Sequence, residues 1–261
     1  MPLNPINYIC LLFGSLNFVW LTITSVIVLK RNPQEKLNWL FASSFGFLAI
    51  AYAILPIGAF TRPENDPTVM LNLTKTYGLT LFIGLVLMAI CSIAIRHGTQ
   101  FVFRWRIIIP VILVILTAGA IIFAFNDTDG FFWSIKAVPG EGADTTNSTF
   151  FMITFYPLAL IFIIITLVFF SITFREAEDP LVKNKLRFFL IGYVICISSL
   201  IPNIASSLLD DIWEYSQFLN GLEFLMVALG ITLMSVGFLS RSVEEETPNE
   251  KLAMSQESSS I

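Results

Sequence analysis

The chain contains seven apolar stretches that are each long enough to cross a lipid bilayer. A membrane-spanning helix needs about 20 mostly apolar residues, because each residue adds ~1.5 Å along a hydrocarbon core ~30 Å thick. Backbone groups in lipid must satisfy their hydrogen bonds internally, which favours helices here. We therefore expect an all-α integral membrane protein with a seven-transmembrane helix bundle over residues 1–240, with spans at about 6–29, 37–60, 76–95, 105–125, 150–174, 186–209 and 217–239.

Composition supports the membrane class and excludes a nucleic-acid partner. The 261 residues are 56% hydrophobic and 13% charged, whereas a soluble domain is about 45–50% apolar and about 25% charged. The formal net charge is −4, and no cluster of Lys and Arg could neutralise a series of phosphates. The lipid bilayer is therefore the first partner that the sequence predicts.

The charges in the loops predict the orientation of the bundle. The side that holds residues 30–36, 96–106, 175–187 and the C-terminal tail carries twelve basic residues, and the opposite side carries three, Arg62, Lys75 and Lys136. Cytoplasmic loops are enriched in Lys and Arg. We expect the N-terminus outside, the C-terminus in the cytoplasm, and a location in the plasma (cytoplasmic) membrane.

Two segments outside the spans carry their own signals. Phe131–Val138 is apolar and aromatic between Asp129-Gly130 and Pro139-Gly140, which is typical of a short strand or hairpin covering the bundle mouth. An ordered loop that dips its aromatic side chains into the membrane interface is the other interpretation. Residues 241–261 are rich in Ser and Glu, and we expect a disordered cytoplasmic tail with no output domain after the seventh span.

Enzyme chemistry has no visible basis in this chain. Zinc-dependent membrane hydrolases need several ligands at membrane depth, yet the chain has one histidine, His97, in a predicted loop beside Arg96. The cysteines, Cys10, Cys91 and Cys196, have no CxxC spacing. The serines of the sixth predicted span have no base to activate them. We expect no enzyme, no metal and no cofactor.

Two well-known seven-helix classes do not fit the sequence either. A retinal-type photoreceptor needs a lysine within the membrane, and every lysine is expected in a loop, a tail or a helix end. The rhodopsin-like G-protein-coupled receptors end their third span in an acidic-Arg-aromatic triplet, where this chain has Ala94-Ile95-Arg96-His97.

A candidate binding site centres on Glu223, the only acidic residue inside a predicted span. Placing a carboxylate at the bilayer centre costs about 2.5–3.5 kcal/mol on insertion scales, so such a residue is a functional candidate by default. Further polar or aromatic residues lie at a similar depth in the outer half. If their faces converge, they form a ligand site lined by polar and aromatic groups, with the candidates Glu223, Asn220, Asn203, Tyr156, Tyr77 and Tyr52.

Two roles remain open for Glu223. Polar side chains in membrane helices often bond a neighbouring helix, typically for ~0.6 kcal/mol. In that role Glu223 would only hold the bundle together. In the other role it would contact a ligand or a proton.

The second half of the chain contains a set of short motifs between Phe131 and Ala228. They are Phe132-Trp133-Ser134, the Pro139-Gly140 loop, the basic turn Lys183–Arg187, Leu200-Ile201-Pro202-Asn203 with Asp210-Asp211 downstream, and Phe218–Ala228. With the seven-span plan, they make the chain similar to the N-terminal seven-transmembrane sensor region of bacterial and archaeal histidine kinases. That resemblance implies a sensor at membrane depth coupled to a cytoplasmic output domain, and we expect no such domain in this chain.

These observations lead to one main hypothesis and two alternatives. The main hypothesis is a sensor or receptor-like module that binds an unknown small-molecule or lipid ligand in its outer half. It would signal through a separate cytoplasmic partner. The first alternative is a small transporter or proton-coupled carrier that uses Glu223, and the second is a structural membrane subunit.

Overall fold

The structure is a computed structural model and describes residues 5–61, 67–124, 133–138, 142–147, 149–208 and 213–239. Within these ranges seven helices are long and apolar enough to cross a membrane. Six of these spans are single helices. The remaining span, the sixth along the chain, consists of two consecutive helices, α7 and α8. The helices are α1 (Pro5–Arg31), α2 (Lys36–Thr61), α3 (Pro67–His97), the short α4 (Thr99–Val102), α5 (Trp105–Ala124), α6 (Thr149–Glu176), α7 (Pro180–Ser198), α8 (Leu200–Leu208) and α9 (Trp213–Leu239). The predicted all-α, multi-pass bundle is confirmed.

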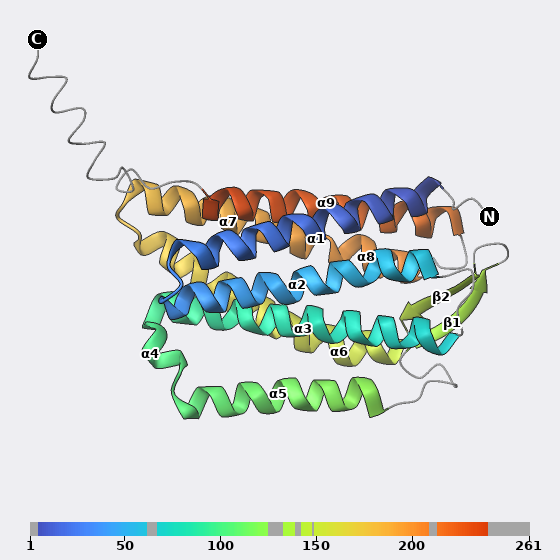
Figure 1. Ribbon diagram of the computed structural model, residues 1–261, viewed down its shortest axis with the longest axis horizontal. Coiled ribbons are helices and arrows are strands. Elements are labelled where there is room, and N and C mark those ends of the chain that lie inside the picture. The colour runs from blue at the N-terminus through green and yellow to red at the C-terminus, as the bar shows by residue number, and fades with distance from the viewer. Residues whose placement is uncertain are drawn as a thin grey trace, which may run out of the picture.

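The long helices lie side by side with their axes roughly aligned (Figure 1). Their contacts form a closed ring in the order α1, α2, α3, α6, α7, α9 and back to α1, while α5 lies outside this ring against α3. The interior of the ring is filled by large apolar side chains, including Leu21, Phe45 and Phe170, which are essentially inaccessible. The candidate site residues are carried by helices of this ring and by α8, which packs against α9.

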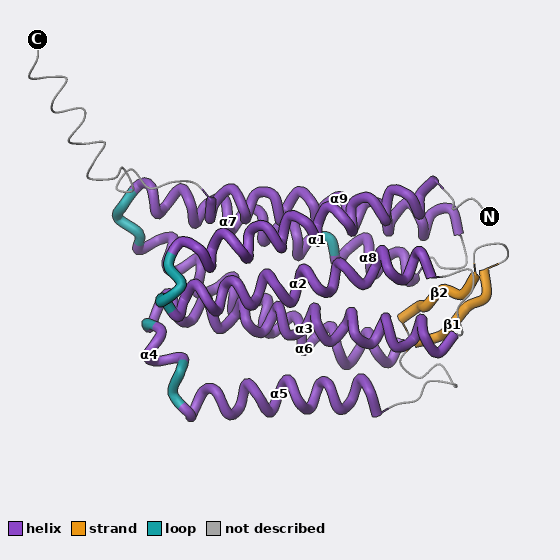
Figure 2. The backbone as a smooth tube through the Cα atoms, viewed as in Figure 1, coloured by secondary structure: helices purple, strands orange, loops and turns teal. Residues whose placement is uncertain are grey.

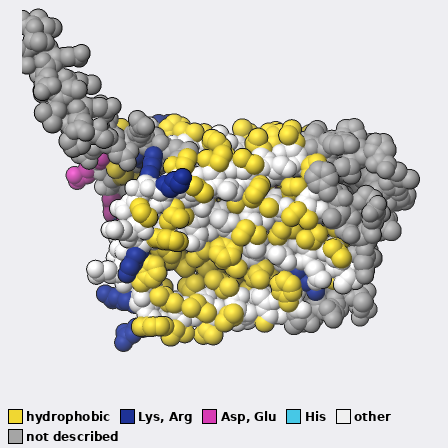
Figure 3. All heavy atoms as spheres, viewed as in Figure 1, with side chains coloured by type: hydrophobic (Ala, Val, Ile, Leu, Met, Phe, Trp, Pro, Cys, Tyr) yellow, Lys and Arg dark blue, Asp and Glu magenta, His cyan; other side chains and the backbone are white. Residues whose placement is uncertain are grey.

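The outer surface of the bundle is suited to lipid. Side chains such as Leu113 and Leu116 on α5 and Ile201 on α8 are apolar and exposed. Hydrophobic side chains cover most of the visible face between the two ends, and most of the visible Lys and Arg side chains gather at the end where α4 lies (Figures 1 and 3). Such a basic end is what the loop charges predict for the cytoplasmic side.

A β-hairpin lies at the opposite end of the bundle. Strand β1 (Trp133–Val138) pairs antiparallel with β2 (Gly142–Asn147), so that Trp133 faces Asn147 and Val138 faces Gly142. Both strands contact α3 (Figure 2). Of the two interpretations of Phe131–Val138, the structure has the strand and hairpin over residues 133–138.

The third helix differs from the prediction. It begins at Pro67, nine residues before the expected start at residue 76. The polar residues there do not end the helix, because Thr74 Oγ1 donates to Met70 O at 3.0 Å and Thr76 Oγ1 donates to Asn72 O at 2.7 Å. Lys75 therefore lies inside a helix and is 2% exposed. The expectation that every lysine lies in a loop, a tail or a helix end is wrong for Lys75, so location alone no longer excludes a Schiff-base lysine.

The sixth span starts earlier than expected and is broken. The Asp179 side chain caps the start of α7 by accepting a hydrogen bond from Leu181 N at 2.8 Å, and Pro180 occupies the first turn. The break falls at Ser199. Pro202, three residues later, has no N–H to donate to the preceding turn, which explains why the helix is interrupted here. The tail at 241–261 lies outside the described residues.

Candidate functional site

A chain of hydrogen bonds joins three of the predicted site residues. Tyr156 Oη donates to Asn203 Oδ1 at 2.7 Å, and Asn203 Nδ2 donates to Glu223 Oε2 at 2.8 Å. The amide thus uses its acceptor toward the phenol and its donor toward the carboxylate. The three side chains come from α6, α8 and α9, so one polar chain links three helices.

The break in the sixth span positions Asn203 for this role. Asn203 lies in the first turn of α8, directly after Pro202, and its own N–H donates to Ser199 O at 3.3 Å. α8 packs against α9, which carries Glu223. The proline explains the local change of direction at this point of the helix, and the interhelical hydrogen bond follows on the far side of it.

The α7 segment before the break is held tightly against α9. A Cβ built on Gly192 would lie 2.8 Å from the Met234 backbone nitrogen, and one built on Gly237 would lie 2.7 Å from Lys185 O. Small residues let the backbones of membrane helices approach closely, and at these two positions even a Cβ atom would clash. α7 therefore has little room to move relative to α9, whereas α8 is connected to α7 through the break.

Tyr52 and Tyr77 lie near the same carboxylate. Both phenol groups lie within electrostatic range of the Glu223 carboxyl group, and Tyr77 lies within the same range of Tyr156. Tyr52, on α2, is buried, and Tyr77, on α3, is half-buried. Together with the hydrogen-bonded chain, five helices contribute a polar or phenolic group to one region of the interior.

Asn220, the sixth predicted residue, stands apart from this group. It is half-buried on α9, and no hydrogen bond within the described parts of the chain reaches it. It lies one helical turn before Glu223, closer to the start of α9. The structure thus brings five of the six candidates together and leaves Asn220 at the edge of the cluster.

Glu223 lies farther from the start of its helix than the sequence suggested. α9 begins at Trp213 rather than at Gln217, so Glu223 lies ten residues, or ~15 Å, from the start of the helix. Tyr156 lies seven residues, or ~10 Å, into α6. Both positions fall in the half of the bundle that ends at the hairpin (Figure 1). Within that half, the cluster lies close to the middle of the bundle.

The sequence did not single out a buried polar face on α1. Asn17 and Thr24 are both fully buried, on the same helical face as Leu21 and Val28. Thr24 Oγ1 and Ser235 Oγ share a buried hydrogen bond of 2.8 Å between α1 and α9. The signal was available, because a polar Asn17 inside the first apolar run lies seven residues before Thr24, two turns along one helical face.

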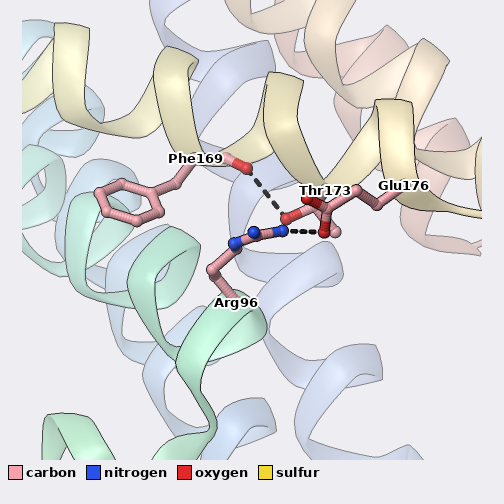
Figure 4. Close-up of polar contacts among 4 residues, drawn as sticks. All are labelled: Arg96, Phe169, Thr173 and Glu176. Carbon is pink, nitrogen blue, oxygen red and sulfur yellow. Dashed lines mark hydrogen bonds and ion pairs between the residues drawn. The ribbon is translucent and has the colours of Figure 1, made fainter.

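An ion pair joins α3 and α6 at the end of the bundle where α4 lies. Arg96 Nη1 donates to Glu176 Oε2. On the same face of α6, Thr173 Oγ1 donates to Phe169 O at 2.9 Å (Figure 4). His97 is the last residue of α3, and its ring lies 5.7 Å from that of Phe169. The helices that carry Tyr77 and Tyr156 near one end are therefore bonded to each other at the other end.

The fold and the site together define a multi-pass membrane protein with a polar cluster in its interior. A scan against protein-family models finds no match for this chain, and a search of curated proteins finds no similar sequence. The functional argument therefore rests on the arrangement of these residues.

Proposed function

We propose that this protein is a sensor or receptor-like module that binds a small-molecule or lipid ligand at the Tyr156–Asn203–Glu223 chain. The N-terminus and the hairpin face the outside of a plasma membrane, and the basic end faces the cytoplasm, where a separate signalling protein reads the state of the bundle. The excess of Lys and Arg on that side supports this orientation.

The single observation that carries the proposal is the hydrogen-bonded chain itself. A ligand with a hydrogen-bond donor or a positive charge competes with Asn203 Nδ2 for Glu223 Oε2, the two atoms being 2.8 Å apart. Tyr52 and Tyr77 supply phenol groups beside the same carboxylate. Sites of this kind, with a few convergent polar groups between helices, are typical of ligand binding in helix bundles.

Movement of two helices would transmit the binding event. When Asn203 loses its hydrogen bonds to Glu223 and Tyr156, α8 is no longer bonded to α9 or to α6 by these side chains. The glycine contacts keep α7 on α9. α6 also carries Glu176, which bonds Arg96 at the basic end. A shift of α6 at Tyr156 therefore changes the α3–α6 contact on the cytoplasmic side, and the resemblance to histidine-kinase sensor regions suggests a kinase-like partner there.

The break between α7 and α8 favours a second candidate, a proton-coupled carrier. Transporters commonly place their coupling-ion sites beside interrupted helices near the bilayer midplane, and Glu223 lies beside such a break. A carrier needs aqueous access to Glu223 from both sides of the membrane in alternation, whereas a receptor needs access from the outside.

Cysteine labelling from each side separates the two candidates. In a background with Cys10, Cys91 and Cys196 replaced by Ala, Gly221→Cys reports on the outer half, and a side chain there meets nothing within 4 Å. Ser235→Cys is nearly isosteric and reports on the inner half, where Ser235 is fully buried. A receptor gives labelling of Gly221→Cys from the outside by a membrane-impermeant thiol reagent. Labelling of Ser235→Cys from the cytoplasm identifies a carrier and contradicts the receptor proposal.

The Glu223→Gln variant tests whether Glu223 has more than a structural role. The variant keeps the shape of the side chain and its acceptor oxygen but removes the charge. We expect a ligand found by thermal-shift screening of primary amines, polyols and short-chain lipids to stabilise the wild type and not Glu223→Gln, while the control Glu176→Gln responds like the wild type. A destabilised Glu223→Gln bundle that still responds fully to the ligand leaves only the structural role.

A further inference from the structure

Three polar atoms in the interior of the bundle have no hydrogen-bond partner among the described residues. They are Asn17 Nδ2 and Trp20 Nε1 on α1 and the Tyr193 hydroxyl on α7. Asn17 is 1% exposed and Tyr193 is 4% exposed. Buried polar groups in native proteins are almost always hydrogen-bonded, to protein or to ordered water. Three exceptions in one region therefore require an explanation.

The Thr24–Ser235 hydrogen bond shows where Asn17 and Trp20 of α1 lie along the bundle axis relative to the residues of α9. α1 and α9 both start at the hairpin end and run in the same direction (Figure 1). Trp20 lies four residues, or ~6 Å, before Thr24, and Asn17 lies seven residues, or ~10.5 Å, before it. Glu223 lies twelve residues, or ~18 Å, before Ser235. Asn17 and Trp20 are thus between the Glu223 cluster and the Thr24–Ser235 pair.

Tyr193 lies at the same level as Trp20. Its neighbour Gly192 touches α9 between Gly230 and Met234, which lie ~7.5 Å and ~1.5 Å before Ser235 along the helix. Tyr193 and Trp20 also belong to the same cluster of packed side chains. The Tyr193 hydroxyl approaches Thr166 on α6 without forming a hydrogen bond of acceptable geometry.

Water is the ligand that these groups fit best. Asn17 Nδ2 and Trp20 Nε1 are both donors, so neither can satisfy the other and both need an acceptor. They are three residues apart on one face of α1, where side chains are neighbours, so one water oxygen can accept from both. The same water can then donate to the Tyr193 hydroxyl oxygen. A buried water typically makes about three such bonds.

We propose that Asn17, Trp20 and Tyr193 form a buried water-binding site in the middle of the bundle. The site extends the polar interior inward from Glu223, since Asn17 and Trp20 lie between Glu223 and Ser235 along the bundle. Polar groups then follow one another along the interior from the Glu223 cluster to the Thr24–Ser235 pair. The inference concerns water alone and does not depend on the receptor proposal.

Hydroxyl-radical labelling by pulsed X-ray radiolysis tests the site in the full chain in lipid nanodiscs. Radicals generated from a bound water modify the side chains beside it, even where bulk solvent has no access. We expect Trp20 and Tyr193 to be modified at least tenfold faster than Met88, a reactive residue that is 1% exposed in the same cluster. Rates for Trp20 and Tyr193 no higher than that of Met88 would overturn the proposal.

Two variants make the test specific. Asn17→Leu replaces the donor by an apolar group of similar volume, and we expect modification of Trp20 and Tyr193 to fall at least fivefold. The matched control Thr22→Val, on the same helix, removes a hydroxyl that bonds its own helix at Phe18 O, and should leave both rates unchanged. Equal rates in Asn17→Leu and Thr22→Val contradict the site.

The unfolding midpoint of Asn17→Leu gives an independent result. Removing a polar group that lacks any partner raises the midpoint, because its desolvation is no longer uncompensated. Removing a group bonded to water lowers the midpoint or leaves it unchanged, and that is the outcome we expect. If Asn17→Leu does not fold, Trp20→Phe removes the second donor, and the modification rate of Tyr193 then decides in the same way.

Discussion

The close contact between α7 and α9 predicts that replacing glycine by alanine on α9 changes the stability of the bundle in opposite directions at two positions. Gly230 is buried, and a Cβ built there would lie 2.5 Å from Gly192 O and 3.0 Å from the Cys196 backbone nitrogen. Gly221, nine residues earlier on α9, has nothing within 4 Å of such a Cβ. We compare Gly230→Ala with Gly221→Ala.

The magnitudes follow from the atoms that each methyl group meets. At Gly230 the methyl group meets Cys196 Sγ and also the Gly192 carbonyl oxygen on α7. Rotation of the cysteine side chain cannot relieve the contact with the backbone carbonyl, so the two helices must separate. Overpacking of this kind costs about 1–3 kcal/mol, and we expect about 2 kcal/mol or more. At Gly221 the methyl group is free, and the higher helix propensity of Ala stabilises by up to about 1 kcal/mol. The expected difference between the variants is about 3 kcal/mol.

Reversible unfolding in mixed micelles, followed by circular dichroism, measures this difference. Adding Cys196→Ala to Gly230→Ala should not restore stability, because the Gly192 carbonyl remains in place. Because α7 leads directly into the break before Asn203, Gly230→Ala should also weaken ligand binding at Glu223. A Gly230→Ala variant as stable as Gly221→Ala would refute the close α7–α9 contact and the idea that α7 is held on α9 while α8 moves.

Four further substitutions have expected outcomes in the same unfolding assay. Thr24→Val breaks the buried hydrogen bond to Ser235 and should lower the free energy of unfolding by about 0.6 kcal/mol. A decrease above about 2 kcal/mol would contradict a single hydrogen-bonded pair. Glu176→Gln should change stability by less than about 1 kcal/mol, because its side chain is 57% exposed, although it should alter the resting output of the bundle in a signalling assay. Phe82→Ala, at a position with no exposure, should cost about 3 kcal/mol or more, whereas Leu116→Ala on the lipid-facing side of α5 should cost less than about 0.5 kcal/mol.

The number and identity of the long helices were predictable from the sequence because each apolar run is long enough by itself. The start of α3 was not, because Asn72, Thr74 and Thr76 make the first turns polar. Their side chains bond back to the helix, so a polar stretch continues the helix instead of ending it. The buried Lys75 was missed for the same reason, since hydropathy cannot distinguish a polar helix start from a loop.

The depth of the site residues was predictable, but their directions were not. Counting residues from the helix ends placed Glu223, Asn203 and Tyr156 in the same half of the bundle, where two hydrogen bonds now join them. The rotation of each helix about its axis depends on packing between helices. That rotation decides which polar groups meet, and it leaves Asn220 outside the hydrogen-bonded chain although it lies one turn from Glu223.

The proposed function also depends on the break between α7 and α8, whose consequences cannot be read from the sequence alone. Pro202 is visible in the sequence, and proline interrupts or kinks helices, but its effect on Asn203 requires the position of α9. Likewise, the buried face of α1 with Asn17 contains no acidic residue, so a search for charged groups at membrane depth does not find it.

A double-mutant cycle on Asn203 and Glu223 tests the central claim most directly. The free energies of unfolding of Asn203→Ala, Glu223→Ala and the double variant give the coupling between the two side chains, and Asn203→Ala with Ser235→Ala serves as a distant control pair. The hydrogen bond of 2.8 Å predicts a coupling of about 0.6–1.7 kcal/mol, with the control pair additive. Additivity of Asn203→Ala and Glu223→Ala to within about 0.3 kcal/mol would contradict the polar chain on which the proposed function rests.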